Sequence, residues 1–143
     1  MVTDRRRGTR VEEGTVKFGD FPDILGATFT VAAENAGAGT INVAIQVNDG
    51  LGNALTSPVA LPWYFANDSA GLTPTTTAHD GGSAIGTDGA LIESVANLSG
   101  ILVTEADGDA DITITDAGAF TVYLVLVMPT GELAISGAIT HAA

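Results

Sequence analysis

The feature that most constrains this fold is a strict alternation of apolar with polar or small residues that returns along most of the chain. Its clearest example is the run from residue 41 to 47, where Ile41, Val43, Ile45 and Val47 occupy every second position. A period of two places such side chains on one face of an extended strand, whereas a helix needs a period of about 3.6. The run therefore predicts a strand with one buried face.

The same alternation recurs in short runs that are separated by glycine, proline, asparagine and aspartate, which favour turns. The runs cover residues 28–33, 59–65, 101–105, 112–115, 120–128 and 133–140, with shorter candidates at 83–86 and 90–95. Roughly eight or nine short strands with frequent turns are typical of an antiparallel β-sandwich, and no stretch has the period of an amphipathic helix. Pro62 lies inside one run and has no N–H to donate, which predicts an edge strand or a bulge there.

A chain of 143 residues is long enough for one domain with its own core. Residues 1–26 have no sustained period and contain four glycines and one proline, which predicts an extended arm. The predicted organisation is an N-terminal arm over residues 1–26 and an all-β sandwich over residues 27–143.

Charge is divided unevenly between these two parts. The first 17 positions hold three acidic residues and all five basic ones, which are Arg5, Arg6, Arg7, Arg10 and Lys17. Residues 18–143 hold the other 14 acidic residues and no lysine or arginine. Such a body argues against nucleic-acid binding, whereas the basic residues predict that the arm binds an acidic surface of a partner protein. The alternative is a solvated tail whose arginines have no specific partner.

Several classes of chemistry lack their sequence signatures. There is no cysteine, which excludes disulfides and thiolate metal sites, and no nucleotide-binding, zinc-protease or serine-hydrolase motif occurs. His79 lies beside Asp80 in a polar region with Ser69 and Ser83, but nothing in the sequence orients these residues as a catalytic triad. His141 is expected to be a partly exposed residue at the end of the last strand. We therefore expect a protein that is not an enzyme and needs no cofactor.

Four acidic residues alternate between positions 105 and 111, namely Glu105, Asp107, Asp109 and Asp111. Acids spaced by two are typical of the start of a calcium-binding loop, but the glycine is misplaced and no glutamate closes the cage twelve residues on. The alternatives are a solvated hairpin turn, which the sequence favours, and a structural calcium site.

Neither secretion nor membrane insertion is indicated by the sequence. The basic N-terminus is not followed by an apolar segment, and the longest apolar run, residues 122–128, is far shorter than the ~20 residues of a membrane helix. We expect a protein that is made in the cytoplasm and has no membrane partner.

The strand predicted over residues 120–127 is apolar on both faces. Phe120, Val122, Leu124 and Leu126 form the row expected in the core, and the opposite row is Tyr123, Val125 and Val127. Because one face of a two-layer sandwich is normally wet, this outer row needs a cover from the arm, the long polar loop or another subunit. We expect these three residues to form a contact between copies of the chain.

Residues 103–140 resemble the second half of bacterial and phage immunoglobulin-like domains. The likeness is carried by the turn 104–108, by the strand with Ile112 and Ile114, by the corner at Asp116 and Gly118, and by Tyr123 and Gly131. It implies an immunoglobulin-like sandwich, with Trp63 in its core and a hydrogen bond from the Tyr123 hydroxyl to nearby backbone. Tyr123 departs from the usual spacing, because it lies five residues after Gly118.

More loosely, residues 29–140 are similar to small proteins that are encoded with phage head genes. The shared stretches are residues 41–46, the pair Trp63 and Tyr64, residues 84–89 and residues 136–140. This resemblance implies a virion protein that decorates the capsid and docks on the major capsid protein through its arm, as a trimer where shells have three-fold sites. The alternative is a tail, neck or fibre module whose loop 67–90 contacts the host surface.

Overall fold

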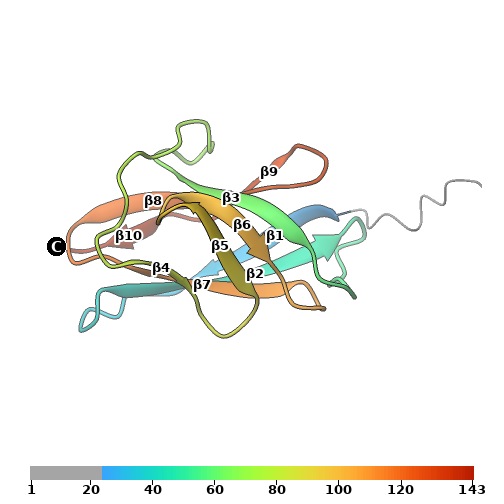
Figure 1. Ribbon diagram of the computed structural model, residues 1–143, viewed down its shortest axis with the longest axis horizontal. Coiled ribbons are helices and arrows are strands. Elements are labelled where there is room, and N and C mark those ends of the chain that lie inside the picture. Colours follow the sequence, from blue (N-terminus) through green and yellow to red (C-terminus); the bar gives the residue numbers. More distant parts are fainter. Residues whose placement is uncertain (1–23) are drawn as a thin grey trace, which may run out of the picture.

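The computed structural model describes residues 24–143, which form ten strands and no helix. The strands are β1 (Ile24–Val31), β2 (Thr40–Asp49), β3 (Ala60–Ala66), β4 (Gly82–Ile85), β5 (Ala90–Val95), β6 (Ser99–Val103), β7 (Asp109–Thr115), β8 (Phe120–Val127), β9 (Leu133–Ile135) and β10 (Ile139–His141). Figure 1 shows them stacked in two layers. The expected all-β antiparallel sandwich is confirmed, and no helix that could cross a membrane occurs in the described residues.

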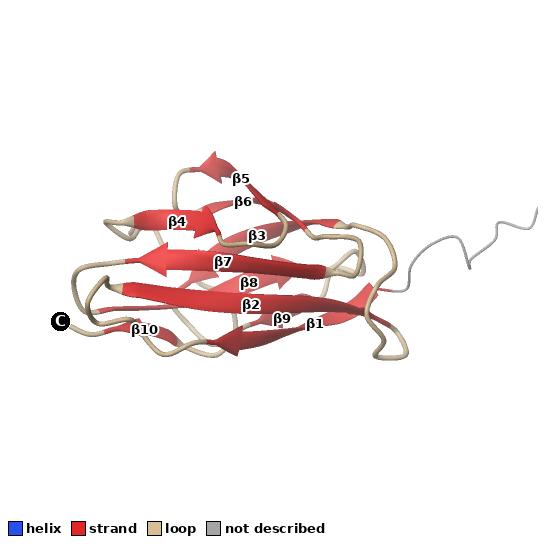
Figure 2. Cartoon of the chain, turned by 90° about the horizontal axis from the view of Figure 1, so that it is seen from below, coloured by secondary structure: helices blue, strands red, loops and turns tan. Residues whose placement is uncertain are grey.

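The two sheets have different widths. One has four strands in the order β1-β2-β7-β4, and the other has six, in the order β10-β8-β3-β6-β5 with β9 also paired to β8. All pairings are antiparallel. Figure 2 shows β1 at one margin of the four-stranded sheet and β4 at the other. Strand β1 contains no charged residue, although it lies at an edge.

The core lies between the inner faces of the sheets and follows the predicted alternation. In β2, every second residue from Ile41 to Val47 is at most 2% exposed. Opposite them lie buried side chains of the six-stranded sheet, which are Leu61, Trp63, Phe65, Leu102, Val122, Leu124 and Leu126. Burying a side chain of this size contributes roughly 1.5–3 kcal/mol relative to exposure, so this double row is a large apolar contribution to the stability of the sandwich.

Two boundaries differ from the sequence-based expectation. Strand β1 begins at Ile24, so residues 24–26 belong to the sheet and not to an arm. The expected last strand is divided into β9 and β10, and Ser136 lies between them. The Ser136 hydroxyl accepts a 2.9 Å hydrogen bond from the N–H of Leu124, so a side chain replaces the backbone group that an unbroken strand would supply.

Strand β3 is not an edge strand, and the prediction made from Pro62 is wrong on this point. It lies between β8 and β6 in the six-stranded sheet. Its pairing with β8 runs from Trp63 to Ala66 and stops before Pro62, whereas Pro62 pairs with Ile101 on the β6 side. A proline is tolerated in this central strand because it lies just beyond the segment paired with β8.

Candidate functional site

The predicted partner-binding residues lie outside the described part of the chain. Arg5, Arg6, Arg7, Arg10 and Lys17 all precede Ile24, where the description begins. Their role in binding an acidic partner stays a prediction.

The outer face of β8 is covered by the chain itself. Val125 pairs with Tyr64 of β3 on one side and with Ile135 of β9 on the other, and its side chain is fully buried. Gly71, from the loop after β3, lies so close above this row that a Cβ there would be 3.2 Å from Val125 and 3.1 Å from Ile135. The expectation that Val125 contacts another copy is therefore corrected, because residues of the same chain occupy that space.

Tyr123 and Val127 flank Val125 on the same strand and are partly exposed. They remain candidates for a contact between subunits. Within the described residues, the tyrosine that donates a hydroxyl bond to backbone is Tyr64, whose bond to the carbonyl oxygen of Gly71 is 2.6 Å. Because Tyr64 lies on β3 and bonds to a residue further along the chain, this bond is not the tyrosine corner that the resemblance implies for Tyr123.

The loop between β3 and β4 has a structured beginning. The Asp68 carboxylate accepts hydrogen bonds from the N–H groups of Ala70 and Leu72, at 2.9 and 3.1 Å. A side-chain hydrogen bond from Thr73, followed by that from the Leu72 N–H, lowers the pKa of Asp68. At this ordered turn Leu72 is 75% exposed.

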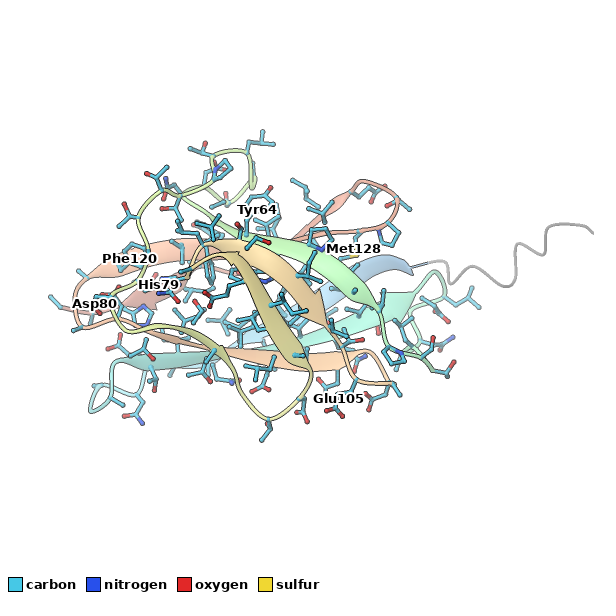
Figure 3. The ribbon with its side chains drawn as sticks, viewed as in Figure 1. Tyr64, His79, Asp80, Glu105, Phe120 and Met128 are labelled. Carbon is cyan, nitrogen blue, oxygen red and sulfur yellow. The ribbon has the colours of Figure 1, made fainter. Side chains whose placement is uncertain are left out.

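The acidic residues 105–111 are used differently from one another, and Figure 3 shows Glu105 at the margin of the molecule. Asp111 lies on the outer face of β7, opposite the core residues Ala110 and Ile112, where its carboxylate accepts hydrogen bonds from Asn42 and from the N–H groups of Thr87 and Asp88. Burial acts to raise its pKa, but these hydrogen bonds outweigh burial and lower it. For Asp109, burial and then the charge of Asp88 raise the pKa.

No group of three or more acidic or histidine side chains among residues 24–143 is arranged to hold a metal ion. The Glu105 carboxylate accepts a hydrogen bond from the Gly89 N–H at 3.3 Å, and the Asp107 carboxylate accepts one from Asp109 at 3.3 Å. Together with the bonds of Asp111, these contacts join β7 and the connection that precedes it to the turn before β5, and the choice between a solvated hairpin and a calcium site stays a prediction.

His79 is buried, although it lies in a polar loop. Its Nε2 is 2.9 Å from the hydroxyl oxygen of Ser83, and its Nδ1 has no hydrogen-bond partner. A Ser-His-Asp triad needs a carboxylate at that second nitrogen to orient the ring. The pair formed with Ser83 therefore lacks the third member that its position beside Asp80 suggested.

His141 is also buried, and the expectation of a partly exposed end residue is wrong. It is 1% exposed, and its Nε2 is 3.3 Å from the carbonyl oxygen of Ile114 in the opposite sheet. The alternation itself contained the signal, because His141 is two residues after the buried Ile139 and shares its face.

An open hollow of about 440 Å³ lies at this end of the sandwich, near the C-terminus. Its carboxylates already accept hydrogen bonds from backbone N–H groups: Glu34 from Ala142 at 2.7 Å and Asp80 from Ala117 at 3.1 Å. Asp116 likewise accepts from Asp80, at 3.2 Å. These carboxylates stabilise the connections around the hollow.

No protein-family model matches the chain, and no curated protein matches it. The resemblance to phage immunoglobulin-like domains therefore stays a prediction that rests on residues 103–140. The candidate interaction surfaces in the described residues are Tyr123 and Val127 of β8 and the ordered loop that bears Leu72.

Proposed function

We propose that this chain is a non-enzymatic structural protein of a phage virion, which decorates the capsid and docks on the major capsid protein through its basic N-terminal residues. The observation that carries the proposal is the separation of charge. Residues 24–143 contain twelve acidic residues and no lysine or arginine, whereas all five basic residues lie between positions 5 and 17.

This separation gives an acidic partner surface a means of orienting the molecule. Such a surface attracts the N-terminal residues and repels the sandwich, so one end of the chain is attached and the body projects away. Exposed ion pairs are individually weak, at about 0–1 kcal/mol, and they are screened over about 8 Å at physiological salt. Several pairs acting together, on many copies of a shell protein, would be needed for stable attachment.

The order of the strands supports the immunoglobulin-like part of the proposal. In constant-type immunoglobulin domains, one sheet has the order A-B-E-D and the other contains G-F-C. The orders β1-β2-β7-β4 and β10-β8-β3 agree with this scheme, and Trp63 is buried on the strand in the C position. The hairpin β5–β6, which extends the second sheet beyond β3, is an addition to it.

Association of copies also belongs to the proposal, with a trimer at a three-fold site of the shell as its form. Tyr123 and Val127 are the outer residues of β8 that stay partly exposed after the loop has covered Val125. A contact through these two residues is smaller than one through all three outer residues of β8. The binding sites on the shell must therefore hold the three copies in place.

A second candidate is a tail, neck or fibre module that contacts the host surface. It is favoured by one observation, which is the exposure of Leu72 on a turn that the hydrogen bonds of Tyr64 and Asp68 hold in place. An exposed apolar side chain on a preorganised turn loses little entropy when it binds.

The test locates the full chain on purified phage particles by electron microscopy and measures its occupancy. Density on the capsid surface supports decoration, density on the tail supports the second candidate, and no binding to any virion structure contradicts both.

Removing residues 1–19, or replacing Arg5, Arg6 and Arg7 with alanine, should lower occupancy while the sandwich stays folded. The matched control replaces Glu12 and Glu13 with alanine in the same segment, which should not lower occupancy. Occupancy should also fall as salt rises, and unchanged occupancy in the triple arginine variant would exclude electrostatic docking.

A further inference from the structure

His79 joins the crossover between the two sheets to the core. Residues 67–81 leave β3 in the six-stranded sheet and enter β4 in the four-stranded sheet. His79 is 2% exposed, whereas Ala78 and Asp80 on either side of it are exposed. Figure 3 shows His79 and Phe120 close together at one end of the sandwich.

The imidazole lies between two aromatic rings. Its centroid is 4.6 Å from that of Phe65 and 5.3 Å from that of Phe120, and both contacts are edge-to-face. Phe65 in turn makes an edge-to-face contact with Trp63, the only tryptophan of the chain, at 5.4 Å. The position of His79 is thus linked by contact to a fluorescent side chain.

This environment suits a neutral imidazole and not an imidazolium. One nitrogen faces the Ser83 hydroxyl, and the other has no partner. A neutral ring can leave its unprotonated nitrogen without a donor at modest cost, but a charged ring carries an N–H on both nitrogens. Protonation would therefore place a charge and an unsatisfied N–H in the core, which is costly.

The charged and titratable groups around the ring come from several elements. Burial has the largest effect and lowers the pKa of His79; Asp116 after β7, Asp80 and Glu93 of β5 raise it, and His141 of β10 lowers it. The balance brings the pKa from 6.5 to about 4.

The backbone near His79 forms hydrogen bonds with the sheets before and after residues 76–79, but not within them. The N–H of Thr75 donates to the carbonyl oxygen of Phe65, and the N–H of Asp80 donates to the Asp116 carboxylate. Between these points, no backbone hydrogen bond joins residues 76–79 to either sheet in the described part of the chain. His79 is the buried residue among residues 76–79, and its side chain connects this segment to the core.

We propose that neutral His79 holds residues 76–79 on the sandwich and that acidification releases this segment while both sheets remain paired. Release uncovers the rings of Phe65 and Phe120 and creates an apolar surface that is absent at neutral pH. A released imidazole titrates near 6.5, so the ratio of released to bound segment rises by up to about 300-fold as the pH falls from above 6.5 to below 4.

The experiment measures the full chain at low concentration between pH 8 and 3.5. Backbone hydrogen exchange, corrected for the intrinsic effect of pH, is followed for residues 75–81 and for β2, together with the emission of Trp63 and the ring resonances of His79. Protection at residues 75–81 should fall with the midpoint of His79 titration, while β2 stays protected. His79→Phe keeps an aromatic ring between Phe65 and Phe120 and should abolish the response, and His141→Phe is the matched control that should retain it.

Three results would overturn the proposal. One is constant protection of residues 75–81 across the range, and another is loss of protection in β2 at the same midpoint, which would mean global unfolding. The third is an unchanged response in His79→Phe. If His79→Phe fails to fold, the wild-type comparison decides, because different midpoints for the His79 ring and for residues 75–81 contradict the proposed coupling.

Discussion

The hydroxyl of Tyr64 donates a 2.6 Å hydrogen bond to the carbonyl oxygen of Gly71, seven residues further along the chain. This bond holds the loop against Val125 and Ile135 and so closes the outer face of β8. Burial and then the charge of Asp68 raise the pKa of Tyr64, so the hydroxyl stays a donor to a higher pH than an ordinary tyrosine would.

Replacing Tyr64 with phenylalanine should remove this bond and leave the ring in place. We expect a loss of about 1 kcal/mol in the free energy of unfolding, the usual net value of one hydrogen bond. Urea denaturation measures the loss, and hydrogen exchange at residues 69–72 should show where it acts. Tyr123→Phe, which removes the hydroxyl of a partly exposed tyrosine on β8, is the control. Equal stability of Tyr64→Phe and wild type would contradict a structural role for the bond.

Val125→Asp should destabilise the single chain rather than disrupt an assembly. The side chain is fully buried, and a carboxylate there would lose its hydration without gaining a partner. We expect a loss of at least about 3 kcal/mol, measured by thermal or denaturant unfolding. Leu72→Asp changes an apolar residue that is 75% exposed and should alter stability by less than about 0.5 kcal/mol. A folded Val125→Asp variant of normal stability would mean that the loop does not cover this position.

Asp111→Ala should weaken the junction between β2, β7 and the turn before β5. Its carboxylate accepts hydrogen bonds from Asn42, Thr87 and Asp88, with the shortest at 2.6 Å. Removing the carboxylate leaves these donors without their acceptor. We expect the free energy of unfolding to fall by about 2 kcal/mol at pH 7. The pKa of Asp111 is lowered in the folded state. The stabilisation is therefore complete at pH values above 3.8, the ordinary pKa of the group, and is lost as the pH falls through the lowered folded-state pKa. The difference between wild type and Asp111→Ala in urea denaturation should therefore shrink at strongly acidic pH.

His79 should make the stability of the whole chain depend on pH in a higher window. Its pKa is lowered to about 4 in the folded state, so the unfolded chain binds more protons between about 4 and 6.5, and stability falls as the pH falls through that range. The free energy of unfolding should decrease by up to about 3 kcal/mol, and by less where release of residues 76–79 relieves the burial. Urea denaturation at pH 7 and pH 4.5 measures the decrease, which His79→Phe should reduce. A stability that is flat across this window would show that His79 does not titrate below its ordinary range.

The inner faces of the sandwich were predictable from the sequence because they depend on local alternation. The run Ile41, Val43, Ile45 and Val47 and the run Val122, Leu124 and Leu126 are buried as their period of two requires. The division of the last strand was not predictable, since it depends on the Ser136 hydroxyl replacing a backbone acceptor for Leu124.

The cover of Val125 could not be read from the sequence for a different reason. It comes from Ile135, the partner of Val125 in the β8–β9 hairpin, and from Gly71, which lies far earlier in the sequence and meets them only in the folded chain. The central place of β3 could not be predicted for the same reason. A proline prevents pairing only where the neighbouring strand needs its N–H, and the pairing of β3 with β8 ends before it reaches Pro62. Contacts of this kind depend on which strands become neighbours, and the alternation does not specify that.

Within residues 24–143, strand β1 pairs with β2 alone and leaves a row of backbone donors and acceptors without a strand partner at one margin of the four-stranded sheet; none of its eight residues is charged. Natural edge strands commonly carry lysine, proline or a bulge that discourages pairing with another molecule. Strand β1 has one such irregularity, at its start between Ile24 and Gly26, and from residue 27 on protection falls largely to the net charge of −12, which acts between whole molecules. Close to the isoelectric point of about 4.1 the repulsion vanishes, and colloidal stability should then be lost through β1. The buffer in which the protein is concentrated therefore decides whether this margin stays free or becomes the start of an aggregate.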